Sequence, residues 1–470
     1  LSAWGFAKLA GFESDTGELT SGEARLVASQ LLNLVMFGLS MIAALGTAFL
    51  AGPTLAGEIE SGMALAVLGS VVFTVLERTV FHGPIPALSG PVFFVLAVLF
   101  WGPTLVMNKG DMVQMNVQNA LSEDTTTHWH GFHIPAVMDG GPHQVIPKGT
   151  TWSPSFTVMN DAGTYWYHPH LHTTTQAQLT RGAGGLIIIR DAQEAALALP
   201  RTYGVDDIPL VLTSRRYLAT NQFDLTTAYG DVMLTNGVQG AQATLPAQLV
   251  RLRILNAEIE RAYNLGFSDG RTFRLIATDG GLVNTPVTTD RVKLYPGERV
   301  ELVVDLAAGA VGSTVDLQAF NGGLPFGWPG GEPAQSGAFG SLLNNKTFTV
   351  LSIKTGAATA GAVKTLPAQL AQNVYPTAAQ VTNSRTIRIT DMGPGTPFTF
   401  DNVGFDANKI NQTVALGAVE QWTISNGPTF DHSFHIHDVQ FKIVSRSNGA
   451  VPDTENGWKD TVSVPRNTSV

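Results

Sequence analysis

Three stretches of the chain carry the same alternation of apolar and polar residues. They are residues 110–119 (GDMVQMNVQN), 248–256 (QLVRLRILN) and 417–426 (GAVEQWTISN). Successive side chains of a β-strand point to opposite faces of a sheet, so the alternation predicts a half-buried strand in each stretch. Each stretch ends in Asn, and the three are about one domain length apart. The pattern therefore predicts three copies of one β module.

Histidine pairs of the form His-x-His stand at a fixed distance after the first and the last of these stretches. Counted from the final Asn, the two histidines fall nine and eleven residues later in both copies. A further pair lies between them in the chain, so six of the 11 histidines are paired. The three pairs are His128 with His130, His168 with His170, and His435 with His437.

The spacing of these pairs favours a metal cluster. In an extended strand, residues i and i+2 project from the same face, about 6–7 Å apart at Cα, so two imidazoles can reach two neighbouring ions. Imidazole suits copper, zinc, iron and nickel. One such pair is commonly a buried, hydrogen-bonded pair without a metal, but three in one chain favour a cluster. The middle stretch has Leu265 and Phe267 at the same offsets, so we interpret its module as a metal-free spacer.

Several motifs resemble those of the multicopper oxidases, the family of laccases and bacterial cuprous oxidases. HWHG at 128–131, YWYHPHLH at 165–172 with RGAGGLIII at 181–189, and HSFHIH at 432–437 resemble its first three copper signatures. The middle and last parts are also similar to the family. Their motifs are DVMLTNG at 231–237, RLRILN at 251–256, LIATDGG at 275–281, PGERVELVVDL at 296–306 and GWKDTVSVP at 457–465.

The resemblance covers about residues 101–470 and implies an all-β fold of three cupredoxin-like Greek-key β-sandwich domains. We expect the first and third domains to be incomplete, and a hydrophobic, helical segment to precede them. The expected domains are 101–195, 205–360 (the copper-free spacer) and 380–470, after a segment at 1–100.

The resemblance also implies a copper set. A type 2 copper and a pair of type 3 coppers would form a trinuclear cluster that reduces O2, and a type 1 copper would take electrons from the reductant. The implied type 2 ligands are His128 and His435, the type 3 ligands are His130, His168, His170 and His437, and His432 is one type 1 ligand.

Asp139 stands where the family has an acidic residue near the cluster, which implies a role in relaying protons. The alternative is an Asp that opens the Gly-rich turn at 139–142. We expect His432 to lie in the loop before the strand that carries His435, so that it points away from the cluster.

The function that the resemblance implies is oxidation of phenols or metal ions, one electron at a time, coupled to four-electron reduction of O2 to water. O2 and a small reductant are the implied partners. The alternatives are a non-catalytic cupredoxin-fold envelope protein and a chimera of a membrane protein with an oxidase. Relatives that have lost copper also lose the histidines, so the seven ligand-matching histidines favour the oxidase.

The chain has no cysteine, although a type 1 copper needs a thiolate. The family supplies it from a fourth motif, HCHxxxHxxxxM. In the first module the second histidine pair follows the first by 38 residues, and the same interval after His437 falls beyond Val470. We therefore expect the missing motif to lie past the end of this chain, which would leave the type 1 site incomplete and the chain inactive alone.

The first hundred residues differ in character. Residues 27–57 form an uncharged run that is long enough to span a bilayer. Residues 49–68 resemble a permease segment of ABC-2 transporters. Membrane contact through 27–57 and a location on the outer face of the membrane or in the periplasm are the expectations. The strands that would open the first domain are replaced, and residues 92–100 (VFFVLAVLF) are suited to supply one.

Composition adds one exclusion. Charged residues make up 14% of the chain and the net charge is −9, so nothing indicates a nucleic-acid surface. The 49 Gly and 25 Pro agree with a turn-rich, all-β chain.

Overall fold

The computed structural model describes residues 92–95, 101–333, 339–390, 398–427 and 429–470. The apolar run at 27–57 and the permease-like stretch at 49–68 lie outside these residues, so the expected membrane segment is not described. Among the helices of the described ranges, none has both the length and the apolar character needed to cross a bilayer.

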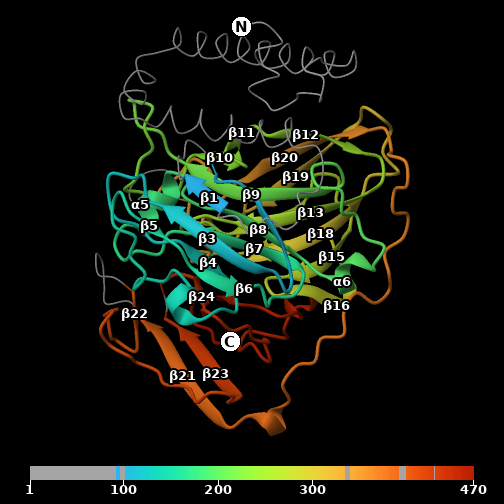
Figure 1. Ribbon diagram of the computed structural model, residues 1–470. Coiled ribbons are helices and arrows are strands. Elements are labelled where there is room, and N and C mark those ends of the chain that lie inside the picture. The colour runs from blue at the N-terminus through green and yellow to red at the C-terminus, as the bar shows by residue number, and fades with distance from the viewer. Residues whose placement is uncertain (1–91, 96–100, 334–338, 391–397, 428) are drawn as a thin grey trace, which may run out of the picture. The chain divides into compact units, whose positions relative to one another are not determined.

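The described residues fold into strands that form two sheets in each of three modules (Figure 1). The first module contains β1 (Val92–Val95), β2 (Leu105–Asn108), β3 (Met112–Gln118), β4 (His128–His130), η1 (Ala136–Met138), β5 (Thr151–Trp152), β6 (Ser155–Thr157), β7 (Gly163–His168), α5 (Thr175–Thr180), β8 (Gly185–Arg190) and α6 (Ala192–Ala195). The second contains β9 (Asp207–Arg215), β10 (Val232–Thr235), β11 (Val238–Gln239), β12 (Gln242–Pro246), β13 (Leu249–Asn256), β14 (Tyr263–Phe267), β15 (Phe273–Thr278), β16 (Gly281–Thr289), β17 (Val292–Leu294), β18 (Arg299–Asp305), β19 (Thr314–Phe320) and β20 (Thr347–Gly356). The third contains η2 (Ala378–Gln380), β21 (Asn383–Thr390), β22 (Thr399–Phe400), β23 (Glu420–Asn426), β24 (His432–His435), η3 (Asp453–Glu455) and β25 (Thr461–Val464).

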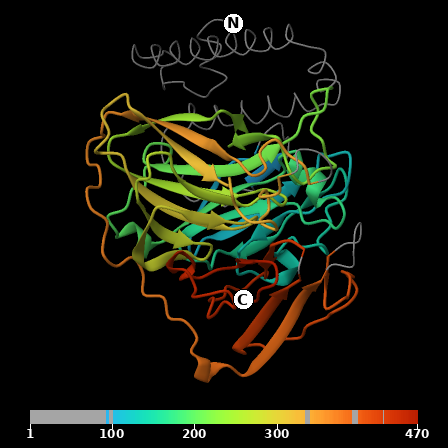
Figure 2. The same cartoon turned by 180° about the vertical axis from the view of Figure 1, so that it is seen from behind.

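The three alternating stretches form equivalent strands, β3, β13 and β23. Each pairs in parallel with a strand that precedes it in the chain: β1 with β3, β9 with β13, and β21 with β23. Strands β9, β13, β18 and β15 lie side by side in the seven-stranded sheet of the second module (Figures 1 and 2). The predicted repeat is therefore one of structure as well as of sequence.

The Asn that ends each stretch makes the same contacts in all three modules. The side-chain amide of Asn119 donates to the carbonyls of Glu123 and Ile146, at 2.9 and 2.8 Å. Asn256 and Asn426 each donate in the same way to two carbonyls, one in the next turn and one 38 residues on. These hydrogen bonds, four of them buried, fix the path from the strand to the segment that carries the histidines in the first and third modules.

The second module holds the largest apolar core. Leu265 and Phe267, which stand at the offsets of the histidines, lie in β14 and are fully buried in that core. Apolar packing thus takes the place of metal ligation at these two positions.

A strand from the segment before residue 101 opens the first module. β1 pairs with β3 in parallel, from Val92 opposite Met115 to Val95 opposite Gln118. The expectation that residues 92–100 supply a strand is confirmed over its first four residues, and residues 96–100 lie outside the described ranges.

Candidate metal centre

The first two histidine pairs meet because β4 and β7 are adjacent antiparallel strands. In their register His128 lies opposite His168, and His130 lies opposite Trp166. The ring centroids of His128 and His168 are 5.2 Å apart. His128 and His130 share one face of β4, as their spacing predicts for an extended strand.

The third pair comes from the last module. β24 pairs with β25, which sets His435 opposite Thr461. His435 is the last residue of β24, and His437 lies beyond its end; His170 likewise lies beyond the end of β7. The first pair therefore lies wholly within a strand, whereas in the other two pairs only the first histidine belongs to the strand.

Two nitrogen–nitrogen contacts join rings from different pairs. Nδ1 of His130 lies 3.1 Å from Nε2 of His168, within the first module. Nε2 of His170 lies 3.1 Å from Nε2 of His437, across the boundary between the first and third modules. The lone pairs of two neutral imidazoles that face each other at this distance could bind one metal ion between them.

Ring stacking closes the group. His128 stacks on His437 with centroids 3.9 Å apart, and His130 stacks on His435 with centroids 3.7 Å apart. Both stacks join the first module to the third. The structure therefore brings together all six paired histidines, which the sequence spreads over 310 positions from 128 to 437.

Two histidine nitrogens among the described residues are buried without a hydrogen-bond partner: Nε2 of His128 and Nε2 of His435. A buried polar atom without a partner costs folding free energy. A bound metal ion such as copper or zinc would give these imidazole nitrogens a partner. Two sets place their donor atoms within 4.8 Å of one another, namely His128, His130 and His435, and His128, Asp139 and His437. The donor set fits a cluster of nitrogen-bound metal ions.

In three of the rings the second nitrogen contacts a backbone carbonyl. Nδ1 of His128 contacts the carbonyl of Asp139 at 3.0 Å, Nδ1 of His168 that of Pro169 at 2.9 Å, and Nδ1 of His435 that of Asp460 at 2.8 Å. Such contacts fix the ring tautomer and leave Nε2 as the ligand atom.

His130 is turned the other way. Its Nε2 contacts Asp460 Oδ1 at 3.2 Å and Thr461 Oγ1 at 3.1 Å, which leaves Nδ1 as the ligand atom. Nδ1 is also the atom that faces His168. The opposite orientation thus follows from a carboxylate that only this ring contacts through Nε2.

Burial keeps the rings in the form that binds metal. Burial, reinforced by neighbouring rings, lowers the pKa of His170 to about 4. Burial likewise lowers the pKa of His435 to about 3, although Asp460 opposes the shift. It also lowers the pKa of His128, and holds those of His130 and His168 well below the ordinary value. Neutral imidazole is the ligating form, so protons do not compete for these nitrogens near neutral pH.

Asp139 joins the first and third modules at the cluster. It follows η1, and its Oδ2 accepts a hydrogen bond from His437 Nδ1 at 2.7 Å and lies 3.2 Å from His128 Nδ1. Burial favours the neutral acid, but the hydrogen bonds from His128 and His437 outweigh it and hold the pKa of Asp139 well below its usual range. Oδ1 is buried without a partner among the described residues. Asp139 thus lies beside the histidines at the end of η1, and its role as a proton relay stays a prediction.

His432 lies apart from the six rings. We expected it in a loop before the strand, but it is the first residue of β24 and pairs with Val464. Residues three apart on a strand point to opposite faces, so His432 still points away from His435. Its ring packs against Phe398, with centroids 4.3 Å apart.

Three residues of the site carry no role in the sequence reasoning: Asp460, Thr461 and Arg299. Asp460 and Thr461 lie in the motif GWKDTVSVP, and Arg299 lies in PGERVELVVDL. The motifs were visible, but their contacts with the histidines join positions as far apart as 130 and 461, which no local pattern reveals.

Comparison with known proteins agrees with this geometry. The multicopper oxidase profiles match residues 94–194, 217–313 and 372–470. The chain is 32% identical over 377 residues to the cell division protein FtsP of Xenorhabdus nematophila, covering 77% of this chain and 74% of that protein. It is 30% identical over 372 residues to the multicopper oxidase mco of Staphylococcus haemolyticus, covering 77% and 73%.

Solved structures of the same family share the fold. The laccase-like multicopper oxidase CueO of Ochrobactrum sp. is 30% identical and superposes with a TM-score of 0.70, covering 79% of this chain and 83% of that one. The multicopper oxidase McoA of Aquifex aeolicus is also 30% identical, with a TM-score of 0.69 over 78% and 81%. The all-β, cupredoxin-like fold is therefore confirmed, and the chain belongs to the multicopper oxidase family.

Proposed function

We propose that this protein binds copper among its six paired histidines and reduces O2 there with electrons taken from a small reductant. Bound copper would supply one-electron redox steps, so that one O2, four electrons and four protons give two waters. The unpaired, buried Nε2 atoms of His128 and His435 carry the proposal, because nothing else among the described residues satisfies them.

The contacts support a division of the ligands. His128 and His435 would hold the type 2 copper, because their Nε2 atoms have no hydrogen-bond partner among the described residues. One type 3 copper would lie between the pair whose nitrogens are 3.1 Å apart in the first module, and the other between the pair that spans two modules. The type 3 ligands are His130 with His168, and His170 with His437.

Proton supply is the proposed role of Asp139. Its carboxylate contacts rings from two modules, and its Oδ1 has no hydrogen-bond partner among the described residues, so it could take up a proton or accept a hydrogen bond from water. An ionised carboxylate beside the proposed metal ligands suits a residue that would hand protons on to reduced oxygen.

His432 would serve the type 1 copper, which takes electrons from the reductant. It lies on the face of β24 opposite His435, so that a copper bound there stays separate from the six rings. The reductant is proposed to be a phenol or a metal ion; the solved Ochrobactrum relative is described as acting on lignin model compounds and lignosulfonate. The proposed location is the cell envelope.

The similarity to FtsP favours a second candidate, a protein that works in the envelope through interactions and without catalysis. Identity to FtsP, at 32%, is as high as identity to the oxidase mco, at 30%, so identity does not choose between them. The converged histidines favour the oxidase, because an interaction surface has no need of six histidine rings that face one another, three of them buried.

Copper titration followed by electron paramagnetic resonance tests the proposal. The copper-loaded chain should give a normal, non-blue Cu(II) signal with nitrogen hyperfine structure. Changing His128→Ala together with His435→Ala should abolish it, because both proposed type 2 ligands are removed.

The matched control changes His133→Ala together with His143→Ala. These rings contact Asp438 and the Ala407 carbonyl and lie outside the cluster. If the signal survives the first pair of changes and is lost with the second, the proposed copper ligands are the wrong histidines. A folded chain that binds no copper would favour the interaction protein.

A further inference from the structure

One buried arginine of the copper-free module contacts all three modules. Arg299 opens β18 and is fully buried. Its Nε donates to the carbonyl of Thr164, in β7, at 3.1 Å, and its two terminal nitrogens donate to the carbonyls of Gly297 and Asp279 at 3.0 Å. The remaining two N–H groups donate to the carboxylate of Asp460, in the third module, at 2.7 and 2.5 Å. All five donors of the guanidinium are thus satisfied.

Asp460 carries this contact to the histidines. Its Oδ1 lies 3.2 Å from Nε2 of His130, and its carbonyl lies 2.8 Å from Nδ1 of His435. One residue therefore holds a ring of the first module and a ring of the third. The guanidinium of Arg299 and the hydrogen bond from His130 outweigh burial and keep the pKa of Asp460 well below its usual range.

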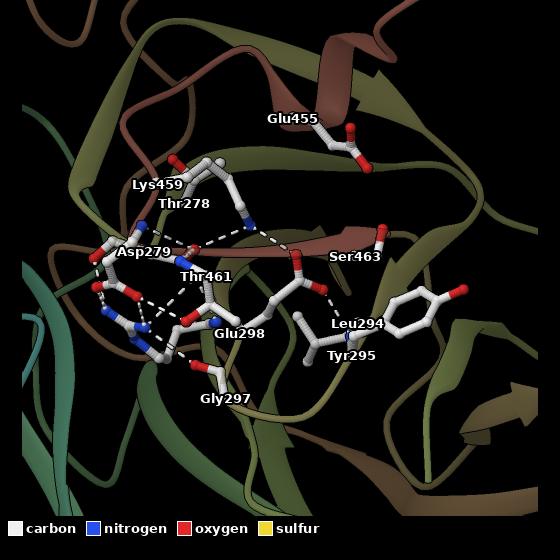
Figure 3. Close-up of polar contacts among 12 residues, drawn as sticks. Thr278, Asp279, Leu294, Tyr295, Gly297, Glu298, Glu455, Lys459, Thr461 and Ser463 are labelled. Atoms are coloured by element: carbon white, nitrogen blue, oxygen red, sulfur yellow. Dashed lines mark hydrogen bonds and ion pairs between the residues drawn. The ribbon is translucent and has the colours of Figure 1, made fainter. Parts of the chain in front are cut away.

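A second ion-pair group holds the same loop on its other side. Lys459, next to Asp460, donates to Glu298 Oε1 at 2.9 Å and lies 3.0 Å from Asp279 Oδ2 (Figure 3). The other oxygen of Asp279 accepts from the backbone N–H of Arg299 at 2.7 Å. Lys459 and Asp460 are therefore both joined to the second module by buried ion pairs. Removal of one partner from such a pair is strongly destabilising.

The backbone that leaves His130 packs directly on the ion pair. Gly131 has a φ of +86°, and a Cβ there would come within 2.5 Å of Asp460 Oδ2 and 2.8 Å of the Arg299 guanidinium. The Gly of HWHG thus lets the first module approach the ion pair closely, which leaves His130 little freedom.

We infer that Arg299 is a positioning residue of the copper centre: through Asp460 it keeps His130 protonated at Nε2, with Nδ1 directed at His168. The inference rests on the proposed copper site and gives the second module a part in that site. Groups that orient a ligating histidine typically change metal affinity about 10–100-fold when they are altered. A change of Arg299 should therefore alter the copper affinity, although Arg299 itself contacts none of the proposed copper ligands.

The test compares Arg299→Lys with Arg251→Lys. Arg251 is also fully buried and pairs with Glu194 and Glu301, but among the described residues neither partner contacts a histidine, whereas Asp460 does. Both changes should lower the free energy of unfolding of the copper-free chain. Arg299→Lys should in addition weaken copper binding about 10–100-fold in competition with a chelator, whereas Arg251→Lys should leave it unchanged.

A second readout needs no copper. Nitrogen NMR of the labelled histidines reports which ring nitrogen carries the proton, and His130→Gln assigns the signal. The unaltered chain should show His130 protonated at Nε2, and Arg299→Lys should give a mixture of tautomers. If Arg299→Lys does not fold, Asp460→Asn, which keeps the shape of the side chain, should give the same results.

Equal copper affinity in the two arginine variants, with the tautomer of His130 unchanged, would overturn the inference and leave the proposed function standing. Failure of the unaltered chain to bind copper would instead overturn the proposed function, and the role of Arg299 with it.

Discussion

At the scale of single residues, Asp139 is the proposed proton relay of the histidine cluster. Asp139→Asn keeps the shape and the acceptor toward His437 but removes the charge. We expect copper content to stay the same and O2 reduction to slow about 10²-fold, because general acid–base groups contribute roughly 10²–10⁴-fold. The measurement is rapid mixing of O2 with the copper-loaded, chemically reduced chain, so that no electron entry from a reductant is needed.

The control for this change is Asp161→Asn, which removes an exposed carboxylate that pairs with Lys109. It should leave the reoxidation rate unaltered. Equal rates for Asp139→Asn and the unaltered chain would assign Asp139 to positioning the rings alone.

At the scale of elements, the repeated Asn offers a comparison within one molecule. Asn426 and Asn256 each donate two hydrogen bonds to carbonyls, so either change to Ala should lower the free energy of unfolding by about 2 kcal/mol, at about 1 kcal/mol per bond. Asn426→Ala should also weaken copper binding, because it frees the segment that leads to His435. Asn256→Ala should not, since the equivalent segment carries no ligand.

Denaturant unfolding and copper titration of the two variants measure these effects. Equal loss of copper affinity in both would show that the effect is one of general stability, and the local role of Asn426 would be refuted.

The repeat explains how much of the fold the sequence predicts. Alternation and the final Asn locate β3, β13 and β23, and fixed offsets locate the histidines of the first and third modules. Local patterns do not tell where a strand stops, so the ends of β7 and β24 and the place of His432 in β24 escaped prediction.

The contacts between modules could not be predicted from the sequence for another reason. Arg299 and Asp460 are 161 positions apart, and their pairing depends on three sheets packing together. The sequence marks both residues within recognisable motifs but contains no signal of which residue each one meets.

At the scale of the whole molecule, copper would act as a clamp. Its proposed ligands come from the first and third modules, and Arg299 ties the second module to both. A ligand that binds only the folded state stabilises it, by about 2.7 kcal/mol at a concentration one hundred times its dissociation constant. Copper binding and the packing of the three modules are thus expected to be coupled.

The most direct test of this account is diffraction from crystals of the copper-loaded chain, with anomalous differences collected at the copper absorption edge. We predict anomalous peaks among the six paired histidines, about 2 Å from the ring nitrogens. The peak next to His128 and His435 should involve their Nε2 atoms, and another should involve Nδ1 of His130 with Nε2 of His168. Ordered rings without anomalous density between them, in a crystal that contains copper elsewhere, would contradict the account.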